Sequence, residues 1–286
     1  MINSPQESSN SRNPSEADGL AHSELPGIRS LGLDLLQVSR TQQMMSLSRP
    51  ALAFASYWVL AVHGWWIPAA LSLVVLQFLT YTSTSHDYVH RTLGLPKWLN
   101  EWLLSVTEGI CLRSGHAFRL THLHHHRAFP ESSDIEAKGA TGSFWRALLQ
   151  GPGNQIRLFI WAWRRANSLE RRWMSAEAIF VSLWWLASGV FYHSAPAIAV
   201  YVVLLTLGGW LYPLATVWWP HRASASHTYQ QTVAVRGRCI PALLLNHTYH
   251  LEHHLYPMVS SHHWRELAHR LDPHFRALGI RPLKLP

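Results

Sequence analysis

The chain has 286 residues, of which 48% are hydrophobic and only 14% charged, with a formal net charge of +8. Charged residues usually make up about a quarter of a soluble domain, so this fraction is low. The two cysteines, Cys111 and Cys239, lie far apart and form no CxxC pair, which excludes a disulfide framework and a thiolate metal site. The 20 histidines and 15 tryptophans are both in excess. A nucleic-acid surface could account for the net charge, but the positions of the charges argue against it.

Two long segments, residues 50–86 and 179–221, contain no Asp, Glu, Lys or Arg. Each exceeds the roughly 18 apolar residues that indicate a membrane span. A single helix of that length would reach roughly 55 Å, against a hydrocarbon core of about 30 Å. We therefore expect each segment to fold back at a turn and form a hairpin of two spans. The four predicted spans are approximately residues 47–63, 68–86, 176–192 and 196–219.

The basic residues lie on one side of this predicted topology. Residues 1–49, 87–177 and 222–286 contain 4, 12 and 8 Lys and Arg, and the hairpin turns contain none. By the positive-inside rule that side is cytoplasmic. The sequence predicts an all-α integral membrane protein with four transmembrane helices in two hairpins and a cytoplasmic helical cap. The alternative, a soluble protein with two buried hairpins, is disfavoured because core helices usually carry a charged face.

Residues 1–26 are rich in Ser, Asn, Glu and Pro. They show no apolar period and lack the basic-then-apolar pattern of a signal peptide. We expect them to form a disordered tail, with the membrane domain occupying residues 27–286.

The histidines concentrate in three short motifs at the predicted cytoplasmic ends: HDYVH at 86–90, HLHHH at 122–126 and HLEHH at 250–254. Helical positions i, i+3 and i+4 share a face. The imidazoles that share a face in this way are His86, His90, His122, His125, His126, His250, His253 and His254. His124 is about 200° around the helix from His122, so we expect it to point away. Eight imidazoles could thus converge.

Neutral imidazole binds iron, copper, zinc and nickel. A single zinc site needs only three or four protein ligands, so eight favour two ions, and a site at a membrane interface favours an oily substrate. The zinc-protease motif HExxH is absent from the sequence, and ExxH, which soluble di-iron bundles use twice, occurs only at residues 266–269. A histidine-rich membrane metal transporter is an alternative from another class. Transporters, however, place ionisable ligands within the bundle, and both hairpins lack acids.

With these motifs in this order, the sequence resembles the membrane-bound fatty acid desaturase superfamily, which includes acyl desaturases, acyl hydroxylases and bacterial carotenoid hydroxylases and ketolases. The resemblance covers roughly residues 50–265 and rests on HDYVH, HLHHH and HLEHHLYP. It implies two iron ions held by the histidine motifs on the cytoplasmic face. It also implies O₂-dependent oxidation of an unactivated C–H bond in a lipid.

Carried over by motif, the resemblance implies as metal ligands His86, His90, His122, His125, His126, His250, His253 and His254. It adds His221, near the end of the fourth predicted span. His247 shares a helical face with His250 and is the second choice for this position. Asp87 is expected either to hold a ligand imidazole through its second nitrogen or to be a solvated acid at the helix end. Asn246 is expected to orient a ligand or a water.

The resemblance implies desaturation of a fatty acyl chain as the first expectation, with a carotenoid ring hydroxylase or ketolase as the alternative. The lipid substrate would come from the membrane, and no nucleic acid is expected. Electrons would come from a separate donor of the ferredoxin, rubredoxin or cytochrome type, because the sequence has no cysteine cluster for an iron–sulfur centre. The basic cytoplasmic face would attract an acidic donor. Asp134 and Glu136 match an acidic stretch of relatives but fit an ordinary loop surface equally well.

Overall fold

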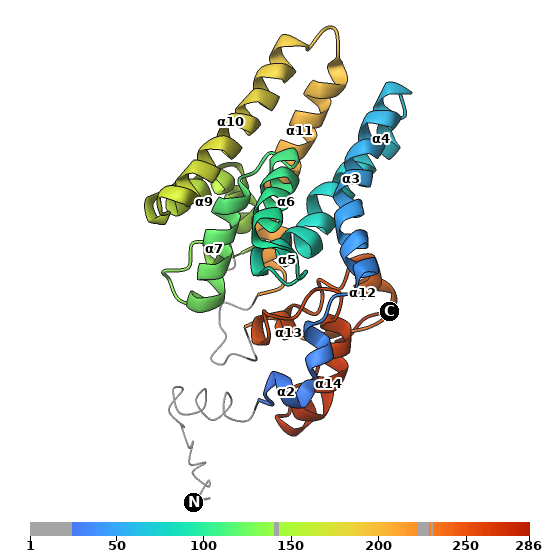
Figure 1. Ribbon diagram of the computed structural model, residues 1–286, viewed down its shortest axis with the longest axis vertical. Coiled ribbons are helices and arrows are strands. Elements are labelled where there is room, and N and C mark those ends of the chain that lie inside the picture. Colours follow the sequence, from blue (N-terminus) through green and yellow to red (C-terminus); the bar gives the residue numbers. More distant parts are fainter. Residues whose placement is uncertain (1–24, 140–142, 222–228, 230) are drawn as a thin grey trace, which may run out of the picture.

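The computed structural model describes residues 25–139, 143–221, 229 and 231–286 (Figure 1). The described chain is mostly helical, as predicted. Its strands, β1 (Val235–Arg236) and β2 (Leu283–Lys284), pair in parallel as one short sheet. The predicted tail at residues 1–26 lies outside the described residues except for its last two.

The first described elements are α2 (Ile28–Leu31), the 3₁₀ turn η1 (Leu33–Leu36) and α3 (Arg40–Val62). Ser39 fixes the start of α3 with a capping box. Its hydroxyl accepts a hydrogen bond from the backbone N–H of Gln42, and the Gln42 side chain accepts one from the Ser39 backbone N–H. The chain thus enters the first hairpin at a defined angle.

The second leg of the first hairpin is a continuous helical run made of α4 (Trp66–Val74), η2 (Val75–Leu79), η3 (Tyr81–Ser85) and α5 (His86–His90). Here η2 and η3 are π-helical. A π turn is wider than an α turn, so it changes which side chains face inward, and it is frequent at functional sites. These two π segments directly precede the first histidine motif and set its orientation.

The second hairpin consists of α10 (Ser168–Val190), α11 (Pro196–Trp210) and the π-helix η5 (Pro213–Trp218). The helix α10 begins before the predicted start at residue 176. Asn167 and Glu170 form a capping box there, which places two polar turns ahead of the apolar segment.

Within the described part of the chain, three helical runs are long and apolar enough to cross a membrane: Trp66–His90, Ser168–Val190 and Pro196–Trp218. The first predicted span, residues 47–63, corresponds to the second half of α3, which is not among them. The first turns of α3 are polar and include Arg40 and Arg49, so only its second half is apolar. Four spans therefore remain a prediction.

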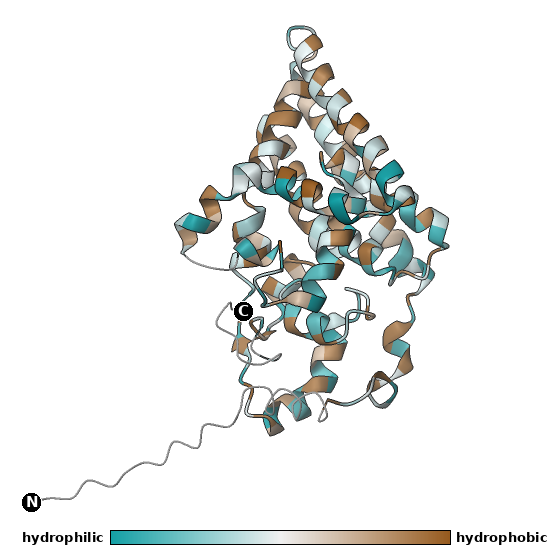
Figure 2. Cartoon of the chain, turned by 90° about the vertical axis from the view of Figure 1, so that its left-hand side faces the viewer, coloured by the Kyte–Doolittle hydropathy of each residue, from teal (hydrophilic) through white to brown (hydrophobic). Residues whose placement is uncertain are grey.

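Apolar side chains on the long helices face outward. On α10, the exposed positions Ile179, Leu183, Leu186 and Val190 follow a helical period and are 55–66% exposed. Apolar residues are frequent along the long helices at the top of Figure 2. A continuous outward apolar stripe of this kind suits contact with lipid.

The remaining helices are α6 (Lys97–Ile110), α7 (Gly115–Ala128), the 3₁₀ turn η4 (Ala137–Gly139), α8 (Phe144–Leu149), α9 (Gly151–Arg165), α12 (Cys239–Leu243), α13 (His250–Leu255) and α14 (Trp264–Ala277). Figure 1 shows both hairpin turns at the upper end and α2, α13 and α14 at the lower end. The apolar face of α14, including Trp264 and Leu271, packs on Leu35 and Leu251 in a separate core. The histidine motifs lie between this core and the hairpins.

Candidate metal centre

Three described helices and one residue that follows a fourth element carry the predicted ligands. The first motif is α5, the second is the last part of α7, the third is α13, and His221 follows η5. Five of these histidines form one group that could hold a metal ion, because one ring nitrogen of each lies within 4.8 Å of the corresponding nitrogens of the others. The group comprises His86, His90, His122, His126 and His253. It unites residues that are more than a hundred positions apart in the chain.

The second group consists of His125, His221 and His254, and meets the same criterion. The Nε2 of His221 is 2.9 Å from that of His125 and 3.3 Å from that of His254. His250 adjoins this group, with its Nε2 3.3 Å from that of His221 and 3.2 Å from that of His254. The structure thus brings all nine predicted ligands together as two neighbouring groups.

The geometry of these nitrogens fits metal binding. Metal–nitrogen bonds of about 2.0–2.1 Å place neighbouring ligand nitrogens about 3 Å apart. The Nε2 atoms of His122 and His126 are 3.0 Å apart, and those of His126 and His253 are 2.8 Å apart. Both ring nitrogens of His86 are buried without a hydrogen-bond partner among the described residues. Buried ring nitrogens without a partner are costly, and a bound ion would give those of His86 one.

The protonation of the cluster also suits a metal. Burial lowers the pKa of His122, His250 and His253 well below the ordinary value of 6.5, and the neighbouring imidazoles lower it further. The metal-binding form of imidazole is neutral. These side chains are therefore in the ligating form at neutral pH.

Two carboxylates orient the second motif. Asp134 Oδ2 lies 2.6 Å from Nδ1 of His125, and Glu136 Oε2 lies 3.2 Å from Nδ1 of His122. A carboxylate that holds the Nδ1 proton leaves Nε2 free for a metal. Burial alone would lower the pKa of His125, but the Asp134 hydrogen bond and charge raise it above its ordinary value. Burial raises the pKa of Glu136 to about 7.

The sequence leaves Asp87 either as the partner of a ligand imidazole or as a solvated acid at the helix end, but its side chain is buried. The Asp87 carboxylate instead accepts hydrogen bonds from Thr92 Oγ1 at 2.7 Å, from Ser260 Oγ at 3.1 Å, and from the backbone N–H and hydroxyl of Ser261 at 2.9 and 2.7 Å. Asp87 thus bonds to Thr92, just after α5, and to Ser260 and Ser261, which follow α13. It therefore anchors the first motif to the loop after the third.

Asn246 and His247 lie in the turn before α13. The Asn246 side-chain amide donates to the backbone oxygen of Ser261 at 3.1 Å, so it supports the loop rather than a ligand. The His247 ring is 4.9 Å from that of His250, and burial lowers the pKa of His247 to about 4. His247 is thus a neutral imidazole beside the second group but outside it.

His124 points away from both groups, which follows from its place on the helix. Its Nε2 lies 3.2 Å from the backbone oxygen of Ser133, and its ring is 4.8 Å from that of Trp161. Glu252, inside the third motif, also turns away. It forms a buried ion pair with Arg236 at 2.7 Å, which ties α13 to β1.

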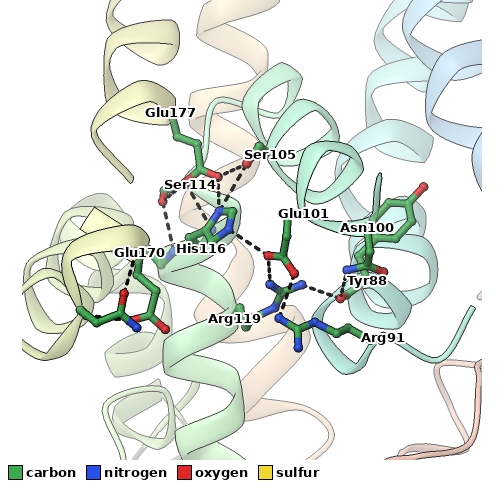
Figure 3. Close-up of polar contacts among 12 residues, drawn as sticks. Tyr88, Arg91, Asn100, Glu101, Ser105, Ser114, His116, Arg119, Glu170 and Glu177 are labelled. Atoms are coloured by element: carbon green, nitrogen blue, oxygen red, sulfur yellow. Dashed lines mark hydrogen bonds and ion pairs between the residues drawn. The ribbon is translucent and has the colours of Figure 1, made fainter. Parts of the chain in front are cut away.

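A buried polar network holds the first half of α7, the helix that carries the second motif, against its neighbours (Figure 3). His116 lies between two carboxylates, with Nε2 3.0 Å from Glu101 and Nδ1 2.8 Å from Glu177. Arg119 pairs with Glu101 and donates to the backbone oxygen of Tyr88 at 2.8 Å. Because these residues come from α5, α6, α7 and α10, the network fixes the first two motifs relative to the second hairpin. From the sequence alone the role of His116 is undecided, with a structural role favoured, since its partners are distant in the chain.

A cavity of about 280 Å³ adjoins the centre. Three of its lining residues touch predicted ligands. These are Glu136, Phe118, whose ring is 5.4 Å from that of His122, and Val217, whose backbone oxygen is 2.9 Å from Nδ1 of His221. The remaining lining is mostly apolar and runs toward α9 and α10. A lipid chain in this cavity would lie beside residues that contact histidines of both groups.

Taken together, the fold and site define a helical protein with membrane-spanning candidates and a buried histidine-rich site that could bind metal. The model of the fatty acid desaturase family matches residues 63–282. This match covers most of the sequence, so the chain belongs to the fatty acid desaturase family, as its motifs predicted. No curated protein sequence matches the chain. Membership in the family indicates an oxidoreductase that desaturates or hydroxylates lipids.

Proposed function

We propose that this protein is an O₂-dependent di-iron oxidoreductase that desaturates a fatty acyl chain. The observation that supports this proposal is that nine imidazoles, six buried and three half-buried, form two adjacent groups, each with enough nitrogens for one ion. When bound, two iron ions would supply oxygen activation and removal of hydrogen from an unactivated C–H bond. Desaturation takes two hydrogens from neighbouring carbons. With two electrons and two protons from a donor, O₂ leaves as two water molecules.

The chain's own residues have separable tasks in this proposal. The two groups of histidines hold the ions, and Asp134 and Glu136 keep His125 and His122 in the tautomer that coordinates through Nε2. The cavity beside Phe118 positions the hydrocarbon and excludes water from it. Close positioning matters because a strong oxidant attacks whichever C–H bond is nearest.

The proposed topology has four spans, with α3 as the first. In support of this, the apolar half of α3 packs beside α4, and its Leu52, Val59 and Val62 are 59–78% exposed. With four spans the histidine motifs share one side, and the basic residues on that side make it cytoplasmic. A separate, acidic electron donor of the ferredoxin, rubredoxin or cytochrome type would dock there.

The test compares His125→Ala with its neighbour His124→Ala in the full-length protein. Iron per chain and the fatty acid profile of the expressing host are measured together. We expect His125→Ala to lose iron and product and His124→Ala to keep both, because only His125 faces the other imidazoles.

Two results would contradict the proposal. Equal loss in both variants would show that the helical face does not select the ligands. One equivalent of zinc in the purified protein, in place of iron, would exclude a di-iron centre.

A further inference from the structure

The cavity beside the centre contains one buried cation. Arg113 is 5% exposed and lines the cavity together with Glu108, which is fully buried. The two side chains form a bidentate pair, with Nε to Oε2 at 2.7 Å and Nη2 to Oε1 at 3.1 Å. The guanidinium also lies over the rings of Tyr81 and Tyr212, 4.9 and 4.5 Å from their centroids. Three side chains, those of Glu108, Tyr81 and Tyr212, thus hold Arg113 in place.

The local backbone brings this pair together. At the end of α6, the N–H of Arg113 donates to the backbone oxygen of Glu108, and that of Leu112 donates to the oxygen of Gly109. This is a Schellman turn, in which the residue at the position of Leu112 is usually glycine because φ is positive there. Leu112 adopts φ 59°. A leucine in this conformation costs free energy, and such costs concentrate at functional sites.

One guanidinium nitrogen of Arg113 does not take part in the pair with Glu108. Its Nη1 is buried and has no hydrogen-bond partner among the described residues. A buried N–H of a charged group without an acceptor is expensive, typically by about 1–3 kcal/mol or more. The pair with Glu108 uses the other two nitrogens, and Arg113 lines the cavity, so a molecule in the cavity is a candidate acceptor for Nη1.

The charge of the cavity restricts that acceptor. The Glu108 carboxylate already neutralises the guanidinium, and Glu136 lines the same cavity. A carboxylate or phosphate entering it would meet these acids with no unpaired cation to offset them. A neutral oxygen can accept from Nη1 without that penalty.

We propose that the cavity binds a lipid through a neutral oxygen, a hydroxyl or a carbonyl, which accepts a hydrogen bond from Nη1 of Arg113. This inference rests on the proposed function and deepens it, because it places the lipid's polar group in the cavity that adjoins the metal centre. Arg113 is then a specificity-determining residue. It favours an oxygenated or esterified lipid over a plain hydrocarbon and over a free acid.

The experiment measures binding, which requires neither iron nor turnover. The full-length protein in nanodiscs is titrated with four probes of equal chain length: hexadecane, 1-hexadecanol, methyl hexadecanoate and hexadecanoate. We expect the alcohol and the ester to bind about tenfold more tightly than the alkane and the acid, in keeping with one hydrogen bond to a charged group. The double variant Arg113→Met with Glu108→Gln removes both charges together, and should reduce this preference to about onefold.

The matched control is Arg270→Gln with Asp34→Asn, which removes an exposed ion pair on another part of the molecule. It should keep the preference. Equal binding of all four probes to the unaltered protein would overturn the proposal, as would tightest binding of hexadecanoate or a preference that survives in the Arg113 variant. Iron content and products are measured on the same preparations. If iron is absent, the proposed function fails while the binding result still stands, so the two failures are distinguishable.

Discussion

Asp134 Oδ2 lies 2.6 Å from Nδ1 of His125, and both side chains are almost completely buried. The carboxylate thereby fixes the ring so that Nε2 faces His221. This contact links a loop to the candidate metal centre. It makes the loop after the second motif part of the site.

Replacing Asp134 by Asn should weaken metal binding while leaving all the ligands in place. We expect iron affinity to fall about tenfold to a hundredfold, as is typical when such a partner of a ligand histidine is lost. Competition with a chelator measures it. Glu131→Gln, an exposed acid in the same loop, is the control and should leave affinity unchanged. An unchanged affinity in Asp134→Asn would contradict the assigned role.

The metal-free protein should lose stability in acid. Burial holds His122, His250 and His253 neutral in the folded state, with each pKa below 6.5. The unfolded chain takes up protons at these positions as pH falls below about 6.5, so the folded state is penalised there. His125 has the opposite effect on stability, because its pKa is raised in the folded state. The three histidines with a lowered pKa should outweigh it.

Thermal unfolding of the metal-free protein from about pH 8 to about pH 5.5 checks this prediction. The melting temperature should fall toward acid pH, and His253→Gln should reduce the slope. His124→Gln should not, because His124 lies outside the cluster. A flat profile would argue against neutral buried imidazoles.

The His116 network should matter for stability rather than for metal binding. His116→Leu leaves Glu101 and Glu177 buried with a lost partner, and we expect unfolding to become easier by about 3 kcal/mol. Unfolding in detergent measures the change. His269→Leu, at an exposed position of α14, is the control and should have little effect. A similar loss in both variants would remove the network's special role.

Alanine substitutions at two glycines of α9 should change the stability of the protein in opposite directions. A Cβ at Gly151 would lie 2.0 Å from the backbone oxygen of Trp210, so Gly151→Ala must push α9 away from α11, at a cost of about 1–3 kcal/mol. A Cβ at Gly153 would meet nothing within 4 Å. Gly153→Ala should therefore stabilise the helix by about 0.5–1 kcal/mol. Melting temperatures of the two variants check the prediction, and equal shifts would contradict the close approach.

The orientation of the protein can be tested with its own cysteines. Cys239 is exposed on the side of the histidine motifs and Cys111 is buried. A thiol reagent that cannot cross membranes should label Cys239 only after the cells are opened, because that side is proposed to be cytoplasmic. In a Cys239→Ser background, His193→Cys at the turn of the second hairpin should be labelled in intact cells. The reverse pattern would invert the proposed topology.

Short sequence patterns predicted much of the fold and of the candidate metal site. The spacing of the histidines depends only on the helical period, so the shared faces of the motifs and the outward direction of His124 follow from consecutive residues. The charge-free segments likewise indicate membrane hairpins, because a span is defined by length and apolarity. The apolarity argument is weaker for α3, because the first half of that helix is polar. It also missed the start of α10, which is set by the Asn167 capping box and not by the apolar segment.

The sequence by itself determined the family and the residues available to bind a metal. Only the tertiary structure decided which acidic residues hydrogen-bond to the ligand histidines. Asp87 is adjacent to His86 in sequence yet bonds to Ser261, whereas Asp134 reaches His125 from a loop. The free nitrogen of Arg113 appears only when Tyr212 and Glu108 are packed around it. Helical period is a local property, but a partner across the fold depends on packing between segments that no short pattern encodes.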